Sequence, residues 1–180
     1  MKKVLALILC LLVSLSATAF AEAAYTYAEY SYDESMFADI DGEWIALEGL
    51  GLKFYLPDIY LAAEVTEDLA AAGVIGLFGM EDSSGALSIS YGPALNTEGN
   101  AVASLEELAA YYTSVGATMV DISYINGIPL LMCMLEATDS VNYTVLFDDG
   151  TQCILTFTPA SDMETAVLAG LISTTVMAAE

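Results

Sequence analysis

The sequence predicts an α+β fold in which helices cover both faces of an antiparallel sheet, and three observations support this class. The dipeptide Asn126-Gly127 separates two strand-like runs and is typical of a tight β-hairpin. The strand after it, residues 128–135, is apolar on both faces, so each face should be covered. Residues 104–107 and 161–164 have capping-box patterns that begin helices, one before and one after the sheet. These two helices are expected to supply the cover.

The first half of the domain is predicted to consist of short strands and one short helix. Short apolar or alternating runs stand between turn residues and indicate the strands. Thr66 is followed by two acids, which is typical of a helix start, and a glycine ends the helix. The predicted strands are residues 44–47, 52–56, 74–80 and 86–91, and the predicted helix runs from Thr66 to Gly73.

The second half is predicted to be a helix, a four-strand antiparallel meander and a last helix. Behind Ser104, one helix face carries Leu105, Leu108, Tyr112 and Val115, and Gly116 ends the helix. The last helix should begin at the second capping box and end near Met177. The predicted strands of the meander are residues 119–125, 128–135, 141–147 and 152–158. Their turns are Asn126-Gly127, residues 138–141 and residues 148–151.

Cys133 and Cys153 are predicted to be reduced thiols buried in the core. Two-residue turns centred on residues 139–140 and 149–150 would place both cysteines opposite Leu146, on one face of the sheet. One strand then separates them, which puts their Cα atoms about 9–10 Å apart. A disulfide needs a Cα separation below about 7 Å. Two free thiols are therefore expected in the folded chain.

The first 21 residues have the three regions of a secretory signal peptide. Lys2 and Lys3 precede an apolar stretch, residues 4–15, that is too short to span a membrane, and small residues at positions 19 and 21 predict cleavage after Ala21. Cys10 lies inside the apolar stretch, where it does not form a lipidation site. The protein is therefore predicted to be secreted or associated with the cell surface, with no membrane insertion after cleavage.

The remainder is predicted to divide into a short tail and one domain. Residues 22–41 hold four tyrosines among small and acidic residues and are predicted to be a linker or a loosely docked tail. Residues 42–180 have the length of one domain and contain no internal repeat, so a single α/β domain is expected.

The charge of the chain limits its partners. After cleavage, Lys53 is the only basic side chain against 25 acids, a formal net charge of −24. Such a charge repels nucleic acid and anionic polymers and favours a cationic partner. The expected partner is an unidentified protein, peptide or cation, and no nucleic acid.

The missing residue types limit the chemistry. The sequence contains no histidine and no arginine, so it lacks the Ser-His-Asp and Cys-His arrangements, imidazole metal ligands and bidentate anion clamps. Lys53 lies in an alternating strand and is expected to be solvated. No catalytic residue and no cofactor are therefore predicted.

One acidic stretch can be compared with a calcium loop. With Gly42 at the sixth position of residues 37–48, Asp39, Asp41 and Glu48 fall on liganding positions. However, Phe37 takes the first position and cannot ligate a metal ion. An acidic turn before the first strand is favoured, and no metal site is predicted.

Four stretches of the sequence carry a family resemblance. They are "SLEELAAYYTSVG" (104–116), "INGIPLL" (125–131), "YTVLFDDG" (143–150) and "LTFTPASDMETA" (155–166). Together with the order of elements, they resemble the small secreted domains of the PsbP-like superfamily from Gram-positive gut anaerobes, over roughly residues 43–178. The resemblance implies an α/β/α sandwich and an exported location. It implies no activity and no catalytic residues.

Two functions are expected from these observations. The first is a non-catalytic binding or accessory module at the cell surface. The alternative is a hydrolase that uses carboxylates alone and acts on glycans. The alternative requires a cleft lined by two carboxylates about 5–10 Å apart, so the geometry of the clefts decides between the two functions.

Overall fold

The computed structural model describes residue 25, residues 27–82 and residues 84–179. The predicted signal peptide and its cleavage site lie outside the described residues. Within the described residues, no helix is both long enough and apolar enough to cross a bilayer.

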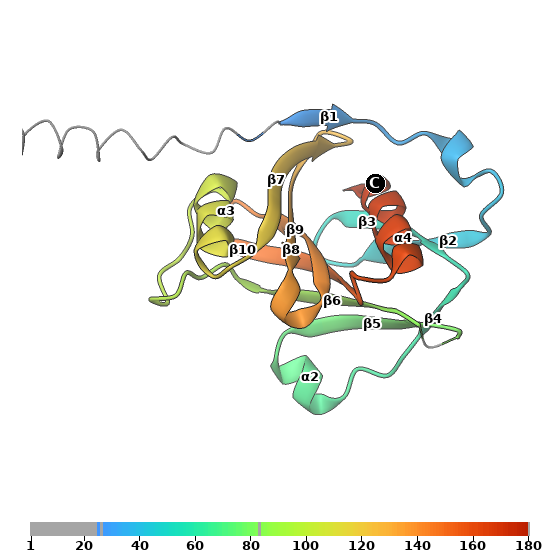
Figure 1. Cartoon of the computed structure of the whole chain (residues 1–180), viewed down its shortest axis with the longest axis horizontal. Coiled ribbons are helices and arrows are strands. Elements are labelled where there is room, and N and C mark those ends of the chain that lie inside the picture. The colour runs from blue at the N-terminus through green and yellow to red at the C-terminus, as the bar shows by residue number, and fades with distance from the viewer. Residues whose placement is uncertain (1–24, 26, 83, 180) are drawn as a thin grey trace, which may run out of the picture.

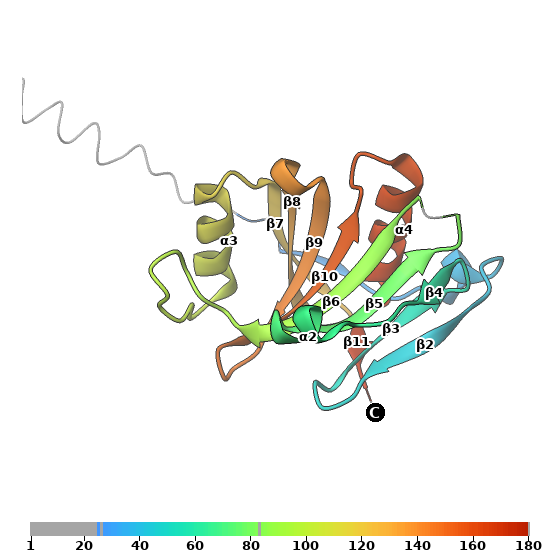
Figure 2. The ribbon, with the colours of Figure 1, turned by 90° about the horizontal axis from the view of Figure 1, so that it is seen from below.

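A large sheet forms the centre of the fold, and the predicted meander lies inside it (Figures 1 and 2). Its strand order is β1-β7-β8-β9-β10-β6-β5-β4, and every pair is antiparallel except β1 and β7. The strands are β1 (Ala28–Tyr30), β4 (Tyr60–Ala62), β5 (Val74–Met80), β6 (Ala86–Pro93), β7 (Thr118–Ile125), β8 (Ile128–Leu135), β9 (Ser140–Leu146) and β10 (Thr151–Thr158). The sequence therefore located the meander strands to within one residue at each end.

A smaller sheet packs against one face of the large one. It has the order β11-β3-β2, with β2 (Gly42–Leu47), β3 (Leu52–Pro57) and β11 (Met177–Ala178). The last helix was expected to continue to Met177, and this is wrong. The helix ends at Ser173, and Met177 instead pairs with Lys53 of β3.

The helices lie on different sides of the large sheet. They are α2 (Glu67–Ala71), α3 (Leu105–Ser114) and α4 (Met163–Ser173). Leu131 and Cys133 of β8 pack in the apolar cluster beneath α3, whereas Leu130, between them and the turn, packs in the cluster shared with α4 and β3. Because alternate residues of a strand point to opposite faces, the apolar clusters that include α3 and α4 residues lie on opposite sides of β8.

The helical cover is less complete than the sequence predicted. Helix α3 contacts β7 and β8, while α4 contacts β3, β9 and β10. On the α4 side, Leu52, Phe54 and Leu56 of β3 provide much of the buried apolar surface. The domain is therefore a sheet-dominated α/β fold in which the small sheet shares the covering role with α4.

The capping interactions explain where the helices begin. The Ser104 hydroxyl accepts a hydrogen bond from the Glu107 N–H, and the Glu107 carboxylate accepts one from the Ala103 N–H. The last helix is capped by Asp162, which accepts from the Thr165 N–H, rather than by the predicted Ser161. Free carboxylate and hydroxyl oxygens thus satisfy the first backbone donors of both helices.

The expected apolar face of α3 is correct except at its end. Leu105, Leu108 and Tyr112 are buried, together with Ala109. Val115 follows the helix and is 47% exposed, because the chain has already left the helical path there.

The tyrosine-rich segment expected as a linker or tail is held against the fold from Tyr27 onward. We call residues 27–41 the N-terminal strap. The Tyr27 hydroxyl donates a hydrogen bond to Glu106 of α3, and β1 adds to the edge of β7. The strap then passes around that edge towards β2 (Figure 1), where the 3-10 turn η1 (Glu34–Phe37) buries Phe37.

Asn126 joins three distant segments. It adopts the left-handed conformation with Gly127 next to it, as the predicted hairpin turn requires. Its backbone N–H donates to the Tyr30 carbonyl, and its side-chain oxygen accepts from the Tyr32 N–H. Its Nδ2 donates to the carbonyls of Thr174 and Val176, at 2.9 and 2.8 Å. One turn residue therefore connects the strap, the hairpin and the segment after α4.

The prediction of two reduced, buried cysteines is correct, but the prediction that both point to the same face of the sheet is wrong. Cys133 and Cys153 are both free and buried. Cys133 pairs with Asn142 on the α3 side, whereas Cys153 pairs with Val145 and points into the cluster on the α4 side. A two-residue turn would have put both on one face.

The two turn geometries explain this difference. Phe147 donates to the Thr151 carbonyl, so the β9–β10 loop has three residues rather than two, with Gly150 at positive φ. One extra loop residue shifts the register by one and reverses the face of Cys153. The β8–β9 loop contains the 3-10 turn η2 (Glu136–Thr138) and a left-handed Asp139, which makes it longer than predicted. The meander was predicted to consist of strands and turns, and η2 adds a short 3-10 helix to it.

The acidic stretch compared with a calcium loop contains a strand. Gly42–Leu47 is β2, with Asp41 immediately before it and Glu48 immediately after it. An extended chain separates these two residues by about 20 Å, so their carboxylates do not converge on one ion. The segment is therefore an acidic turn that leads into a strand, which is the interpretation that the sequence favoured.

The charged residues avoid the centre of the sheet. Strands β5, β6, β8, β9 and β10 contain no charged residue, and none of the described carboxylates is buried. Lys53 is the only basic side chain in the described part of the chain. Most acids therefore lie outside these five central strands, in the solvated parts of the surface.

This acidic surface predicts a dependence of stability on salt. Because like charges repel across the surface, raising NaCl from about 20 to about 300 mM should increase the melting temperature of the protein by several degrees, as the screening length falls to about 6 Å. Thermal unfolding followed by circular dichroism measures the change. Calcium at matched ionic strength should add nothing further. A saturable effect of micromolar calcium would contradict the absence of a specific calcium site.

Candidate ligand-binding site

A pocket of about 290 Å³ lies between the sheet and α4, on the side where the strap passes. It is bounded by one residue of the strap, three strands and the C-terminal half of α4. Its lining residues are Tyr30, Asp121, Ser123, Ile125, Leu130, Met132, Tyr143, Gly170, Ser173 and Thr174. We call it the α4 pocket.

Strand alternation builds the floor of the α4 pocket. Asp121, Ser123 and Ile125 lie at alternate positions of β7 and so point to one face. Leu130 and Met132 of β8 do the same on the neighbouring strand, where Ser123 pairs with Leu130 and Asp121 with Met132. The floor is therefore apolar near the Asn126-Gly127 turn and polar at Asp121.

Gly170 leaves room on the helical wall of the pocket. A methyl group added at this position would have no atom of another part of the protein within 4 Å. A residue with a side chain would project into the space that the pocket occupies. Gly170 therefore helps to keep the pocket open.

Polar groups surround one end of the pocket. The Ser123 hydroxyl lies 3.5 Å from Asp121 Oδ2. Burial raises the pKa of Tyr143, and a hydrogen bond with Ser173 opposes this rise without cancelling it. Tyr143 therefore remains a protonated hydroxyl at neutral pH. The pocket offers one carboxylate and several hydroxyls above an apolar floor, which suits a small apolar group with a donor or cationic head.

The hydroxyls of Ser173 and Thr174 are not arranged as nucleophiles. Ser173 Oγ donates to the Gly170 carbonyl and Thr174 Oγ1 to the Leu171 carbonyl, each at 2.7 Å. A serine or threonine hydroxyl needs a neighbouring base to attack a substrate. Because both protons are directed to helix carbonyls, these two hydroxyls suit binding rather than covalent catalysis.

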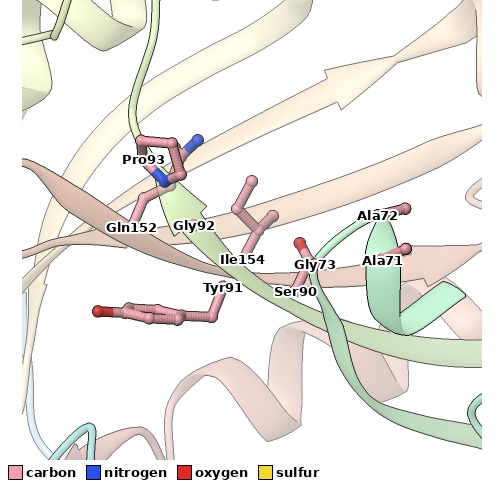
Figure 3. A pocket seen from close by; sticks show the side chains of 9 residues that line it. All are labelled: Ala71, Ala72, Gly73, Ser90, Tyr91, Gly92, Pro93, Gln152 and Ile154. Atoms are coloured by element: carbon pink, nitrogen blue, oxygen red, sulfur yellow. The ribbon is translucent and has the colours of Figure 1, made fainter. Parts of the chain in front are cut away.

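A second pocket, of about 360 Å³, lies on the outer face of β6 and β10 beside the end of α2 (Figure 3). Figure 3 shows Gln152 and Pro93 at one end and Ala71 and Ala72 at the other, with Ile154 between them. No charged residue lines it. It therefore provides few groups that could orient a ligand.

A third pocket, of about 520 Å³, is an open depression between the β2–β3 loop and Tyr91, and its only lining carboxylate is Glu48. None of these three pockets, which involve described residues alone, is lined by two carboxylates. The hydrolase alternative required such a pair, so these pockets give it no support.

Comparison with known proteins relates the architecture to earlier structures. No protein-family model matches the sequence, and no curated protein matches it. The solution structure of cyanobacterial PsbP (CyanoP) from Synechocystis sp. PCC 6803 superimposes with a TM-score of 0.50, covering 76% of this chain and 91% of that chain, at 12% identity. The fold is PsbP-like. This confirms the resemblance seen in the sequence, at the level of the fold.

Two further structures are similar to this chain at lower scores. A crystal structure from Bacteroides thetaiotaomicron gives a TM-score of 0.43 at 16% identity, over 77% of this chain and about half (49%) of that chain. The Ran-binding protein Mog1p from Saccharomyces cerevisiae gives a TM-score of 0.42 at 10% identity, over 78% of this chain and 97% of that chain.

The sequence pointed to no residue of the α4 pocket. Its walls come from β1, β7, β8, β9 and α4, so no local pattern describes it. One signal was present nonetheless. Asp121 is the only charged residue in the four strands of the meander, and an acid among otherwise uncharged strands is a candidate for a functional role.

The open position at Gly170 gives a stability prediction. Replacing Gly170 by alanine should raise the free energy of unfolding by about 0.5–1 kcal/mol, because alanine has the higher helix propensity and its methyl group has free space. Urea denaturation measures this effect, and the dependence of the unfolding free energy on urea concentration should keep the same slope. A decrease in stability would mean that the helix wall is packed more tightly than the structure describes.

Proposed function

We propose that the protein is an exported, non-catalytic binding module that acts at the cell surface as an accessory to a partner protein or peptide. The observation that carries this proposal is the α4 pocket, in which the Asp121 carboxylate and several hydroxyls stand beside an apolar floor. Such a pocket can orient and hold a donor or cationic group of a partner.

The exported location is supported by the amino-terminal sequence. Residues 1–21 have the charge, apolar length and small residues of a secretory signal peptide. Mass spectrometry of the protein recovered from the culture medium or the cell surface should find Glu22 at the amino terminus. Recovery of the uncleaved chain in the membrane fraction would contradict export in this form.

The choice of partner is supported by charge. A chain with a formal net charge of −24 after cleavage is repelled by nucleic acid and by anionic polymers. A protein or peptide partner with exposed basic or apolar groups fits both the surface and the single carboxylate of the pocket.

A pair of variants at Gly170 tests whether the pocket is the binding site. The cleaved protein would be used to capture partners from cell-surface fractions, with Gly170→Leu beside Gly170→Ala. Leucine should fill the pocket and reduce capture at least tenfold, whereas alanine should retain it, and circular dichroism would verify that both variants fold. A partner captured equally by both would rule out the α4 pocket as the binding site.

A further inference from the structure

A group of aromatic side chains lies away from the α4 pocket, where the strap crosses the outer face of the small sheet. The rings of Tyr32, Phe37, Tyr55 and Trp44 contact one another in a closed circuit. Their successive centroid distances, starting with Tyr32 to Phe37 and returning from Trp44 to Tyr32, are 5.8, 5.3, 5.7 and 5.5 Å. We call these four residues the aromatic patch.

One side of the aromatic patch is buried, and the other side is exposed to solvent. Phe37 is buried, whereas Trp44 is 41% exposed. Edge-to-face contacts with Tyr32 and Tyr55 hold the indole of Trp44 at interplanar angles of 74° and 73°. The exposed ring is therefore held in a fixed orientation, so a ligand would not need to order it first.

Trp44 already accepts a cation within the chain. The Lys53 Nζ lies 5.4 Å from the centroid of the Trp44 ring. Lys53 is the only basic side chain in the described residues, and it lies on the strand next to Trp44. The indole thus attracts a positive charge in this structure, as the negative face of an aromatic ring should.

Two carboxylates adjoin the aromatic patch. The Asp58 N–H donates to the Asp41 carbonyl at 2.9 Å, which places these residues side by side at the end of the β2–β3 pair. Both side chains are exposed. Burial raises the pKa of Tyr55, and the charges of Asp58 and Asp41 raise it further, so both carboxylates act on the patch.

We propose that the aromatic patch binds the lysine and arginine side chains of a basic segment in a partner protein, with a cation over Trp44 and its neighbours paired to Asp41 and Asp58. Charge complementarity supports this occupant, because the surface combines an exposed aromatic ring with acids in a strongly acidic protein. The proposal rests on the proposed binding function but uses a surface other than the α4 pocket.

Trp44 provides its own reporter. It is the only tryptophan in the sequence, so fluorescence excited at a wavelength that tyrosine does not absorb observes the aromatic patch alone. The protein would be titrated at about 150 mM NaCl with an octapeptide of alternating glycine and arginine, and with the same peptide carrying citrulline, which is uncharged. The arginine peptide should change the fluorescence saturably, and the citrulline peptide should not. The absence of a saturable change with arginine would overturn the proposal.

Matched variants separate the patch from the general acidity of the surface. Asp58→Asn and Glu98→Gln each remove one negative charge, but Glu98 belongs to the loop between β6 and α3. That loop and β2 lie at opposite ends of the molecule (Figures 1 and 2). Asp58→Asn should weaken binding about three- to tenfold, and Glu98→Gln less than twofold. Equal losses would indicate diffuse attraction and overturn the proposal.

Lys53→Met tests the role of the indole without removing a ring. Because Lys53 competes for the ring and repels cations, its removal should tighten binding several-fold, and a merely structural cluster would not respond in this way. Calorimetry with Trp44→Leu should show about a tenfold loss. Gly170→Leu should bind the arginine peptide normally even if it loses the cell-surface partner. Loss of arginine binding in Gly170→Leu but not in Trp44→Leu would assign the peptide to the α4 pocket instead.

Discussion

Replacing Asn126 by aspartate should lower the free energy of unfolding by about 3–5 kcal/mol. The Nδ2 group donates to the carbonyls of Thr174 and Val176, and an ionised carboxylate has no proton to donate. Each carbonyl left unpaired in a partly buried site costs about 1–3 kcal/mol, and the new negative charge faces both of them. Urea denaturation of the purified protein measures the difference.

Asn126→Gly is the matched control for this prediction. Glycine retains the positive φ of the turn, 50° in this structure, but removes every side-chain hydrogen bond. It should destabilise the protein less than aspartate, because water can enter the vacated space and no charge is introduced. If aspartate were no worse than glycine, the two carbonyls would not depend on Nδ2.

The two cysteines should react with a thiol reagent at least a hundredfold more slowly in the native protein than in guanidinium chloride at pH 8. Burial raises the pKa of Cys133 to about 11 and that of Cys153 to about 12, so few thiolates exist at this pH. Both side chains are also fully inaccessible to the reagent. The protein cleaved after Ala21 and denatured without reductant should contain two free thiols per chain. A measured value of zero would mean that the strand order is wrong.

The same pKa shifts predict how stability changes in alkali. In the unfolded chain a cysteine loses its proton near its ordinary pKa of 9.0, while the folded protein keeps both protons to higher pH. The native state therefore binds more protons above pH 9, and the free energy of unfolding should fall as the pH rises from about 9 towards 11. A Cys133→Val and Cys153→Val double variant should lose part of this decline. An unchanged alkaline slope in that variant would assign the decline to the buried tyrosines alone.

Local chemistry made most of the fold predictable. Asn126-Gly127 fixed one hairpin because two positive φ values in succession suit few other residues. Ser104 and Glu107 identified the start of α3 because their oxygens satisfy exposed backbone donors. Each of these signals acts within a few residues, which is the range that a sequence pattern can describe.

Register and long-range pairing were less predictable. The sequence 148–151 permits a two-residue or a three-residue loop, and only the packing of Cys153 and Val145 against the α4 side selects the longer one. Strand β1 has few aliphatic residues and gains its order from β7, nearly 100 residues later. The α4 pocket and the aromatic patch depend on such distant pairings. No periodic pattern in the sequence identifies the residues that form these two sites.

The three-way junction at Asn126 has a consequence for the order of folding. Its strap partner, Tyr32, is synthesised 94 residues before it, and its partner Val176 is synthesised 50 residues after it. The strap therefore emerges first but finds its complete binding site last, when almost the whole domain has been made. Contacts between residues this far apart in the sequence form slowly. The entropy cost of closing a long loop comes before the free energy that the contacts contribute. The nascent chain should thus keep its tyrosine-rich segment accessible to chaperones throughout synthesis, and docking of the strap should be a late event in folding.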